Sequence, residues 1–408
     1  MKKICKGCNN KIVKIIDICK SPACDLYLKD KKKKLKLHSL DLYFCNKCKL
    51  IQLEDIVSPE KIYNQYLYKS KHSLGLTEHF KSYCHNVIKK LKLNKSHKIL
   101  DIGCNDGTLL DFFVKKGFKV LGVDPANNIS EDCKKKNIKL INSFFDKKLV
   151  NNLLNKHNTF DLITANNVIA NIPKLKEFFS LVSRTLSSRG HFVFETIDGP
   201  SLIKNKYIDM INSEHIYYFS LTSIKNLLDM NGLEIFLVEN IKLKGGSFRV
   251  YARKKHKNIS VSNKNAINIK KSLIYEKKYG FTDLKKIKKY NKIYSLEKKS
   301  FISFIKKLSL KNKIFAYGAS AGSTSLIYFY NLHKIISFVV DDNPLRVNLF
   351  TPGSKIKILH PSKILLHNPE YILILAWRYK KQILTKNKIY TKNGGKFLSL
   401  YPKKELIK

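Results

Sequence analysis

The sequence predicts an α/β protein with a small zinc-binding module at its N-terminus, a Rossmann-like core, and a second Rossmann-like domain at its C-terminus. Three observations predict this fold class. Two Cys-x2-Cys pairs open the chain, an apolar strand runs into a glycine-containing turn near residue 100, and a second strand, glycine turn and helix begin near residue 313. Regular alternation of strands and helices favours parallel sheets with helices on both faces.

The N-terminal module, residues 1–65, is predicted from its cysteines. The pairs Cys5/Cys8 and Cys45/Cys48 are separated by 36 residues, and each Cys-x2-Cys turn can present two thiolates to one tetrahedral zinc ion. So short a segment buries little apolar surface and needs a metal to hold it together. Cys19 and Cys24 lie between the pairs and could replace one of the four ligands.

The core, residues 66–255, is predicted from apolar periodicity. Apolar residues recur at helical spacing between residues 72 and 93, and strands alternate with helices after that. The expected strands are residues 98–102, 119–123, 138–141, 160–164 and 191–195.

Two further parts follow the core. Residues 256–310 are rich in Lys and poor in Gly and Pro, which predicts a helical connector. The last domain, residues 311–408, has strands expected at 313–317, 335–340 and 371–376, with a helix from about residue 322.

Length and composition bound the class of protein. A chain of 408 residues predicts two or three domains. No apolar stretch approaches the roughly 18 residues that cross a bilayer, and a Cys-x2-Cys pair stands where a signal peptide would be apolar. We therefore expect a cytoplasmic protein with no membrane partner, forming a monomer or a weak dimer. Its nine cysteines are expected to be thiols or metal ligands.

The net charge of +47 raises the question of a nucleic-acid partner. Only six of the 78 basic residues are Arg, and the Lys surplus is spread along the whole chain. Because recognition of phosphates and bases relies on bidentate Arg, this pattern favours a solvated surface, and nucleic acid is not expected as a partner. An anionic small substrate would be attracted by the same charge.

The turn at residues 101–107 predicts a nucleotide-type cofactor site. Asp101, Gly103, Asn105 and Gly107 follow an apolar strand, where glycines allow close approach of a backbone to a ligand. Asp124 and Pro125 end the next strand, where a carboxylate can bind a ribose diol. The polar pair Asn166 and Asn167 ends the fourth strand, at the same edge of the sheet. The D-x-G-x-x-x-G pattern with a downstream acid is typical of S-adenosylmethionine (SAM) binding in class I methyltransferases, whereas the G-x-G-x-x-G pattern of dehydrogenases is absent.

Glu214 and His215 are the candidates for acid–base chemistry. They follow the fifth strand, on a segment expected to cover the reactive end of the cofactor. A His beside a Glu is often only a surface pair, but at this position a base could remove a proton from an acidic carbon.

Together, these motifs resemble the three-domain sugar C-methyltransferases of deoxysugar biosynthesis. The resemblance spans nearly the whole chain. It includes both cysteine pairs and residues 101–107, 214–221, 245–251, 316–322, 341–344 and 351–353. It implies a class I SAM methyltransferase core, four cysteine ligands to zinc, SAM in the core, and a nucleotide-linked keto-sugar in the cleft between the core and the last domain.

The resemblance also implies roles for single residues. His215 would be the base beside the keto group, and Glu214 would orient its imidazole. We assign the substrate to Asn171, Asn212, Lys244, Arg249, Tyr317 and Ser320. The family usually has Tyr in place of Asn212, and His in place of both Asn171 and Lys244, so the methylated atom stays open. The turn at residues 318–322 could hold a phosphate at a helix N-terminus or be purely structural.

Two other functions stay open on the sequence. A zinc-module RNA methyltransferase would explain the basic charge, although it would not need the last domain. A non-catalytic relative that binds nucleotide-sugar would explain the replacements at Asn171 and Asn212.

Overall fold

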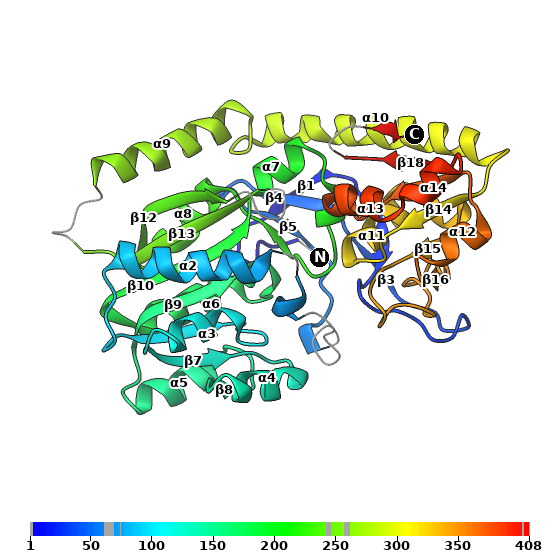
Figure 1. The fold of residues 1–408 in the computed structure, drawn as a ribbon. Coiled ribbons are helices and arrows are strands. Elements are labelled where there is room, and N and C mark those ends of the chain that lie inside the picture. The colour runs from blue at the N-terminus through cyan, green and yellow to red at the C-terminus, as the bar shows by residue number, and fades with distance from the viewer. Residues whose placement is uncertain are drawn as a thin grey trace.

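The computed structural model describes residues 3–60, 69–73, 75–241, 246–256, 262–401 and 404–407. Figure 1 shows two lobes, with the central domain in one and the C-terminal domain in the other, and two long helices along a shared edge. Among the described residues, no helix is both long and apolar enough to span a bilayer.

The N-terminal module is a four-stranded antiparallel sheet in the order β1-β4-β5-β11, together with a two-stranded sheet of β2 and β3. Its last strand, β11, comes from a distant part of the chain and begins two residues after His215. The strands are β1 (Ile12–Ile16), β2 (Lys20–Pro22), β3 (Leu37–Ser39), β4 (Leu42–Cys45), β5 (Ile51–Leu53) and β11 (Tyr217–Tyr218).

The central domain is a seven-stranded sheet in the order β12-β13-β10-β9-β6-β7-β8. Strands β6 to β10 run parallel, and β13 pairs antiparallel with both of its neighbours. The sheet confirms the class I methyltransferase fold expected from the sequence. Its strands are β6 (Lys98–Ile102), β7 (Lys119–Val123), β8 (Lys139–Ile141), β9 (Phe160–Asn166), β10 (Leu186–Ile197), β12 (Leu233–Ile241) and β13 (Ser247–Lys254).

Helices bury both faces of this sheet. Ile99 packs with residues of α2 and α3, whereas its neighbour Leu100 packs on the other face with residues of α6 and α8. Burial on both faces explains the continuous apolar runs in the parallel strands. The helices are α2 (Leu76–Leu91), α3 (Thr108–Val114), α4 (Ser130–Lys135), α5 (Lys147–Asn155), α6 (Leu175–Thr185), α7 (Gly199–Lys204) and α8 (Leu221–Asp229), with short 3-10 turns η1 (Ser70–His72), η2 (Asn127–Ile129), η3 (Ile169–Asn171) and η4 (Ile208–Met210).

The connector consists of α9 (Asn263–Lys278) and α10 (Leu284–Ser309). One apolar stripe of α10 is buried, with Ile287, Tyr294 and Phe301 at seven-residue spacing. This stripe packs with residues of the N-terminal module and the last domain, so α10 joins parts of the chain that are distant in sequence.

The last domain has a six-stranded sheet in the order β16-β15-β14-β17-β18-β19, parallel except for the final pair. It is the second Rossmann-like unit that the sequence predicts. Its elements are β14 (Ile314–Tyr317), α11 (Ala321–Phe329), η6 (Leu332–Lys334), β15 (Ile336–Val340), β16 (Ile358–Leu359), α12 (Lys363–His367), β17 (Tyr371–Ile374), η7 (Trp377–Tyr379), α13 (Lys380–Lys386), α14 (Lys388–Lys392), β18 (Lys396–Ser399) and β19 (Glu405–Ile407).

Candidate active site and zinc site

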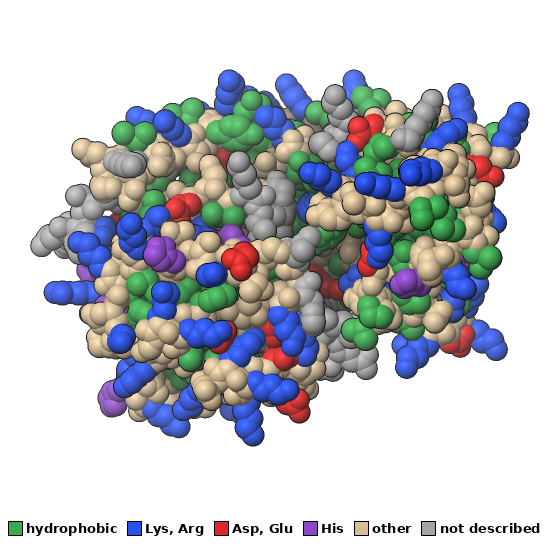
Figure 2. Space-filling view, in the orientation of Figure 1, with side chains coloured by type: hydrophobic (Ala, Val, Ile, Leu, Met, Phe, Trp, Pro, Cys, Tyr) green, Lys and Arg blue, Asp and Glu red, His purple; other side chains and the backbone are tan. Residues whose placement is uncertain are grey.

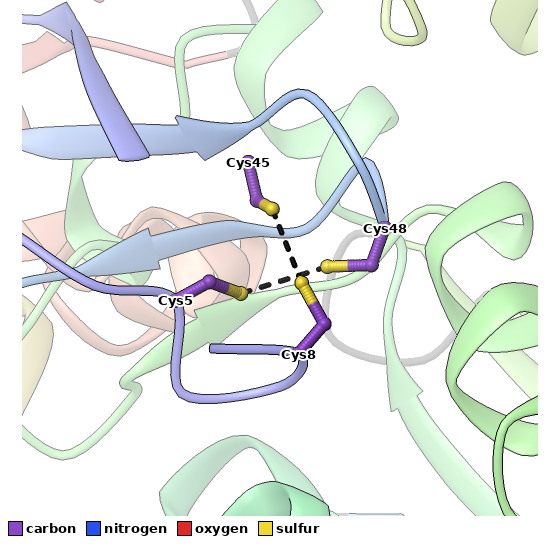
Figure 3. Close-up of side chains that lie close together, drawn as sticks. All are labelled: Cys5, Cys8, Cys45 and Cys48. Carbon is purple, nitrogen blue, oxygen red and sulfur yellow. Dashed lines mark hydrogen bonds between the residues drawn. The ribbon is translucent and has the colours of Figure 1, made fainter. Parts of the chain in front are cut away.

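The four cysteines of the two Cys-x2-Cys pairs converge on one point (Figure 3). The Sγ atoms of Cys5 and Cys48 are 3.5 Å apart, those of Cys8 and Cys45 are 3.4 Å apart, and all four lie within 4.8 Å of one another. Tetrahedral zinc with Zn–S bonds of about 2.3 Å separates its thiolates by about 3.8 Å, so the cluster fits zinc. The structure thus brings the four outer cysteines together as predicted, in a cluster that could hold zinc.

Two N–H groups contact the sulfur of Cys5. The Gly7 amide lies 3.4 Å from the Cys5 Sγ atom, and the Gln52 side-chain amide donates to the same sulfur at 3.2 Å. Such N–H···S contacts around a metal ligand hold its orientation. Gln52 lies on β5, so the zinc cluster is tied to the strand that pairs with β11.

In the glycine turn after β6, neighbouring side chains leave little space around Gly103 and Gly107. Gly103 and Gly107 both have φ +71°, a conformation that glycine tolerates best. A Cβ on Gly103 would lie 2.4 Å from Val168, and one on Gly107 would lie 2.6 Å from Ile138. Of the two glycines, only Gly103 lines the large cavity described below, so Gly107 serves packing.

Asp101 and Asp124 are both buried, but they have different surroundings. The hydroxyl of Thr164 donates to Asp101 at 2.6 Å, and burial raises the pKa of Asp101 to about 7. Asp101 does not line the cavity, and its side chain braces β6 against β9. Asp124 does line the cavity, and burial also raises its pKa.

Each carboxylate oxygen of Asp124 accepts one backbone N–H. Oδ2 accepts from Asn105 at 2.9 Å, and Oδ1 accepts from Ala126 at 2.9 Å. A carboxylate oxygen has capacity for a further hydrogen bond, so Asp124 is held in place and can still bind a ribose diol.

The side chain of Asn105 holds η1 over the glycine turn. Its Oδ1 accepts the Ser70 amide at 2.9 Å, and Asp106 accepts the Lys71 amide at 3.0 Å. Ser70 therefore lines the cavity. This contribution of η1 was not predicted from the sequence, because the helical pattern that follows gives no sign of a preceding turn.

His215 lies in a loop shaped by Asn212. The Asn212 Oδ1 atom accepts the backbone amides of Glu214 at 3.0 Å and His215 at 3.3 Å. The Nδ1 atom of His215 lies 3.1 Å from the carbonyl oxygen of Met210. The Nδ2 atom of Asn212 lies farther from Nδ1, at 3.5 Å. A carbonyl can only accept, so the shorter contact favours the tautomer in which Nδ1 carries the proton and Nε2 can take up another.

Glu214 contacts the N-terminal module. Its Oε1 atom lies 3.5 Å from the buried Cys24 thiol, and the Cys24 amide donates to Ser213 at 3.1 Å. Glu214 thus links the loop of His215 to the N-terminal module.

Two hydrogen bonds fix the chain just after His215. The Ile216 amide donates to the Ala170 carbonyl at 2.7 Å, and the Ile216 carbonyl accepts from Leu53 at 2.8 Å. His215 thus sits where the central domain and the sheet of the zinc module meet.

The last domain repeats the hydrogen-bond pattern of Asp124. Asp341 directly follows β15, and its two oxygens accept the amides of Ala319 at 2.6 Å and Asn343 at 2.8 Å. Tyr317 donates to Asp342 at 2.9 Å, and Ser320 precedes α11. In both domains the acid after the second strand therefore holds the preceding glycine turn.

One cavity of about 1210 Å³ joins these features. Its lining comes from the central domain, the N-terminal module and the last domain. Among the residues predicted from the sequence, it contains Gly103, Asn105, Asp124, Pro125, Asn166, Asn167, Asn171, Asn212, Glu214, His215, Tyr317 and Ser320.

Two residues that we assigned to the substrate lie elsewhere or are not described. Arg249 is buried in β13, where it pairs with Glu195 at 2.7 Å and lies over the Tyr83 ring, and it does not line the cavity. A buried ion pair in a sheet braces the core, and the motif alone could not distinguish this role from substrate binding. Lys244 lies outside the described residues.

The cavity also contains residues that sequence reasoning missed. Asp25, from the insertion between the cysteine pairs, accepts a hydrogen bond from Tyr27 at 3.0 Å, and Tyr27 also donates to the Ala319 carbonyl. Arg346 lies over the Tyr27 ring and 3.7 Å from Asp341. Arg346 follows the Asp341 motif closely, which was a usable signal, whereas Asp25 has no such marker.

Three family models match successive parts of the chain. A zinc binding domain matches residues 5–63, a methyltransferase domain matches residues 76–238, and a C-methyltransferase C-terminal domain matches residues 242–402. The order and extent of the three matches agree with the order of the modules in the fold.

One curated relative matches most of the chain. The C-methyltransferase NovU of Streptomyces niveus is 26% identical over 373 residues, which cover 91% of this chain and 88% of NovU. Among solved structures, the PH0226 protein of Pyrococcus horikoshii aligns with a TM-score of 0.38 at 18% identity, over 49% of this chain and 100% of that protein. The magnesium protoporphyrin IX methyltransferase of Synechocystis with bound SAM aligns with a TM-score of 0.35 at 13% identity, over 45% of this chain and 81% of that one.

Proposed function

We propose that this chain is a SAM-dependent C-methyltransferase that methylates a carbon next to the keto group of a nucleotide-linked deoxysugar. The observation that carries the proposal is the position of His215, with its hydrogen bond and its place in the cavity. Its Nδ1 atom lies 3.1 Å from the Met210 carbonyl oxygen, a contact that favours Nε2 as the proton acceptor, and His215 lines the same cavity as Gly103 and Asp124.

The residues divide into cofactor and substrate sides. In the proposal Gly103 and Asp124, which line the cavity, hold the cofactor together with Asn166 and Asn167 at the same edge of the sheet. When bound, SAM supplies an electrophilic methyl group for the nucleophilic carbon to attack. That chemistry requires alignment within the cavity, which the fixed turn around Asp124 provides.

The substrate carbon becomes nucleophilic only after it loses a proton. In our proposal the C–H bond next to the carbonyl breaks, the proton moves to Nε2 of His215, and the electron pair delocalises onto the carbonyl oxygen. Asn171 lines the same cavity and can donate a hydrogen bond to that oxygen, although an amide cannot shuttle a proton. His215 is then the sole proton acceptor that the proposal requires.

The nucleotide part of the substrate is proposed to lie against the last domain. The turn before α11 lines the cavity through Gly318 and Ser320, so a helix N-terminus faces it. Arg346 lines the same region and offers a guanidinium for phosphate. Because this region and the cofactor turn share one cavity, the sugar would lie between them.

The test is proton exchange without methyl transfer. A keto-deoxysugar nucleotide incubated with the chain in deuterated water, without SAM, is expected to exchange its acidic proton. His215→Asn should lower both exchange and methyl transfer by roughly 10²- to 10⁴-fold, because general-base removal has that cost. Glu214→Gln should lower them less, since Glu214 acts through the loop. Mass spectrometry of the recovered sugar measures the exchange.

The control is Asp124→Ala, which should weaken SAM binding and leave exchange intact. Full methyl transfer by His215→Asn would contradict the assigned base. Binding of the nucleotide-sugar without any exchange would favour a non-catalytic relative, and methylation of RNA without response to the sugar would favour the RNA enzyme.

A further inference from the structure

Exposed apolar side chains gather on the two connector helices. Eighteen large apolar side chains are exposed among the described residues, and seven of them fall within residues 263–310. That segment is about an eighth of the chain, so the apolar exposure is concentrated there. The seven are Ile267, Ile274, Tyr275, Ile293, Leu296, Phe304 and Leu310.

On α10 these side chains form a second apolar face. The buried stripe includes Tyr294 and Phe301, whereas Ile293, Leu296 and Phe304 are 44%, 58% and 48% exposed. At about 100° per residue, Phe304 lies about 20° from Ile293 around the helix, and Leu296 about 60° from it. We call Ile293, Leu296 and Phe304 the outer row. A helix that only joins two domains needs no such row.

Lysines surround the outer row. Residues 263–309 contain 14 Lys and three acids, a larger excess of Lys than in the chain as a whole. Figure 2 shows Lys and Arg side chains beside apolar ones along the upper edge, over α9 and α10. Eight lysines of α10 are exposed, and within the described parts of the chain none of them forms an ion pair: Lys285, Lys286, Lys288, Lys289, Lys292, Lys299, Lys306 and Lys307.

The three acids do not neutralise this face. Glu276 is buried, Glu297 pairs with Lys206 and Lys404 at 2.9 Å each, and Asp283 caps α10 by accepting the Lys286 amide. The face therefore combines exposed apolar side chains with uncompensated positive charge.

We propose that the outer row and its lysines dock the enzyme on the surface of an anionic lipid bilayer. Apolar side chains of a basic helix enter the boundary between headgroups and acyl chains, while Lys side chains reach outward to anionic headgroups. A second copy of the chain would bring two lysine-rich faces together, which like-charge repulsion opposes. Nucleic acid would match the charge but not the apolar row. The sequence predicted no membrane partner because nothing spans a bilayer, and this surface lies on one without crossing it.

The test compares two triple variants of the full chain. In sedimentation with vesicles of phosphatidylcholine and phosphatidylglycerol in equal amounts, we expect the unsubstituted chain to bind, and not to bind vesicles of phosphatidylcholine alone. Ile293→Ser/Leu296→Ser/Phe304→Ser should lower the partition by about tenfold or more. The matched control Leu365→Ser/Leu366→Ser/Ile389→Ser removes side chains that are 46%, 72% and 61% exposed on α12 and α14, and it should bind like the unsubstituted chain. SAM binding, measured by calorimetry, checks that both triple variants are folded.

Three results would overturn the proposal. Equal loss of binding in both triple variants would make the effect unspecific. Vesicle binding that the outer-row variant retains, and that moderate salt abolishes, would mean that lysines alone attract any polyanion. A dimer in analytical ultracentrifugation that only the outer-row variant dissociates would assign the face to a second copy.

Discussion

Asp124 and Asp341 hold their glycine turns by the same two hydrogen bonds, one from the turn and one from the residue two positions further on. Each substitution by Ala therefore removes the same structural support. Asp341 also lies 3.7 Å from Arg346, and the ligands expected beside the two acids differ, with the cofactor at Asp124 and the nucleotide of the substrate at Asp341. Asp124→Ala and Asp341→Ala therefore form a matched pair of variants.

Asp124→Ala is expected to weaken SAM binding by roughly 1.5 to 3 kcal/mol, the usual loss for a hydrogen bond to a charged group. Asp341→Ala should leave SAM affinity within about twofold and raise the KM for the nucleotide-sugar. Calorimetry measures the SAM affinity of each variant, and initial-rate kinetics measure its KM for the nucleotide-sugar. Equal loss of SAM affinity in both variants would mean that the effect is loss of folding, and the ribose contact would have to be sought elsewhere.

At the residue scale, the spacing of residues along the chain predicted only contacts between positions close in sequence or matched in motif. Two cysteines three positions apart can bind one metal from a single turn, so the cluster that the four cysteines form was predictable. The tautomer of His215 was not, because it depends on a carbonyl five residues earlier that only the folded loop brings to 3.1 Å. The ion pair of Arg249 was likewise hidden, since Glu195 lies on a neighbouring strand.

At the scale of elements, the strands of both sheets follow from apolar runs, and the expected ranges 98–102 and 119–123 agree with β6 and β7. Strand β11 escaped prediction because two residues carry no periodicity. Its pairing with β5 joins the N-terminal module to the loop of Glu214 and His215, so the module does not end at residue 65 in three dimensions. We therefore expect loss of zinc to affect the reaction at His215 through the paired strands β5 and β11.

We expect the purified chain to contain about one zinc per molecule and Cys45→Ser to release it. Because Cys45 ends β4 and β4 supports β5, loss of zinc should loosen β11 and lower His215-dependent proton exchange. SAM affinity should change little, since the cofactor turn belongs to a different sheet. Metal analysis, exchange and calorimetry give the three readings. Cys19→Ser, in the same module but outside the cluster, should keep both zinc and exchange. Unchanged exchange in the zinc-free variant would refute the coupling.

At the scale of the whole molecule, the cavity depends on how the lobes meet. Asp209 of η4 accepts the indole N–H of Trp377 at 3.1 Å and pairs with Arg378, both from the last domain. Gly322 at the start of α11 packs so closely on η4 that a Cβ there would lie 2.5 Å from the Asp209 carbonyl oxygen. Sequence reasoning found both domains but not this junction, because contacts between domains leave no periodic pattern in either one.

The junction should control substrate binding more than cofactor binding. Asp209→Ala removes both polar contacts with the last domain and should raise the KM for the nucleotide-sugar roughly tenfold or more, since hydrogen bonds to a charged group contribute about 1.5 to 3 kcal/mol. Trp377→Phe removes only the indole N–H and keeps an aromatic ring against Tyr207, so its effect should be smaller. SAM affinity should stay within about twofold in both, because the cofactor turn lies wholly in the central domain. Since Met210, which orients His215, directly follows Asp209, Asp209→Ala should also lower kcat, whereas Trp377→Phe should not. A parallel loss of SAM affinity would show that Asp209 supports the central domain instead of the junction.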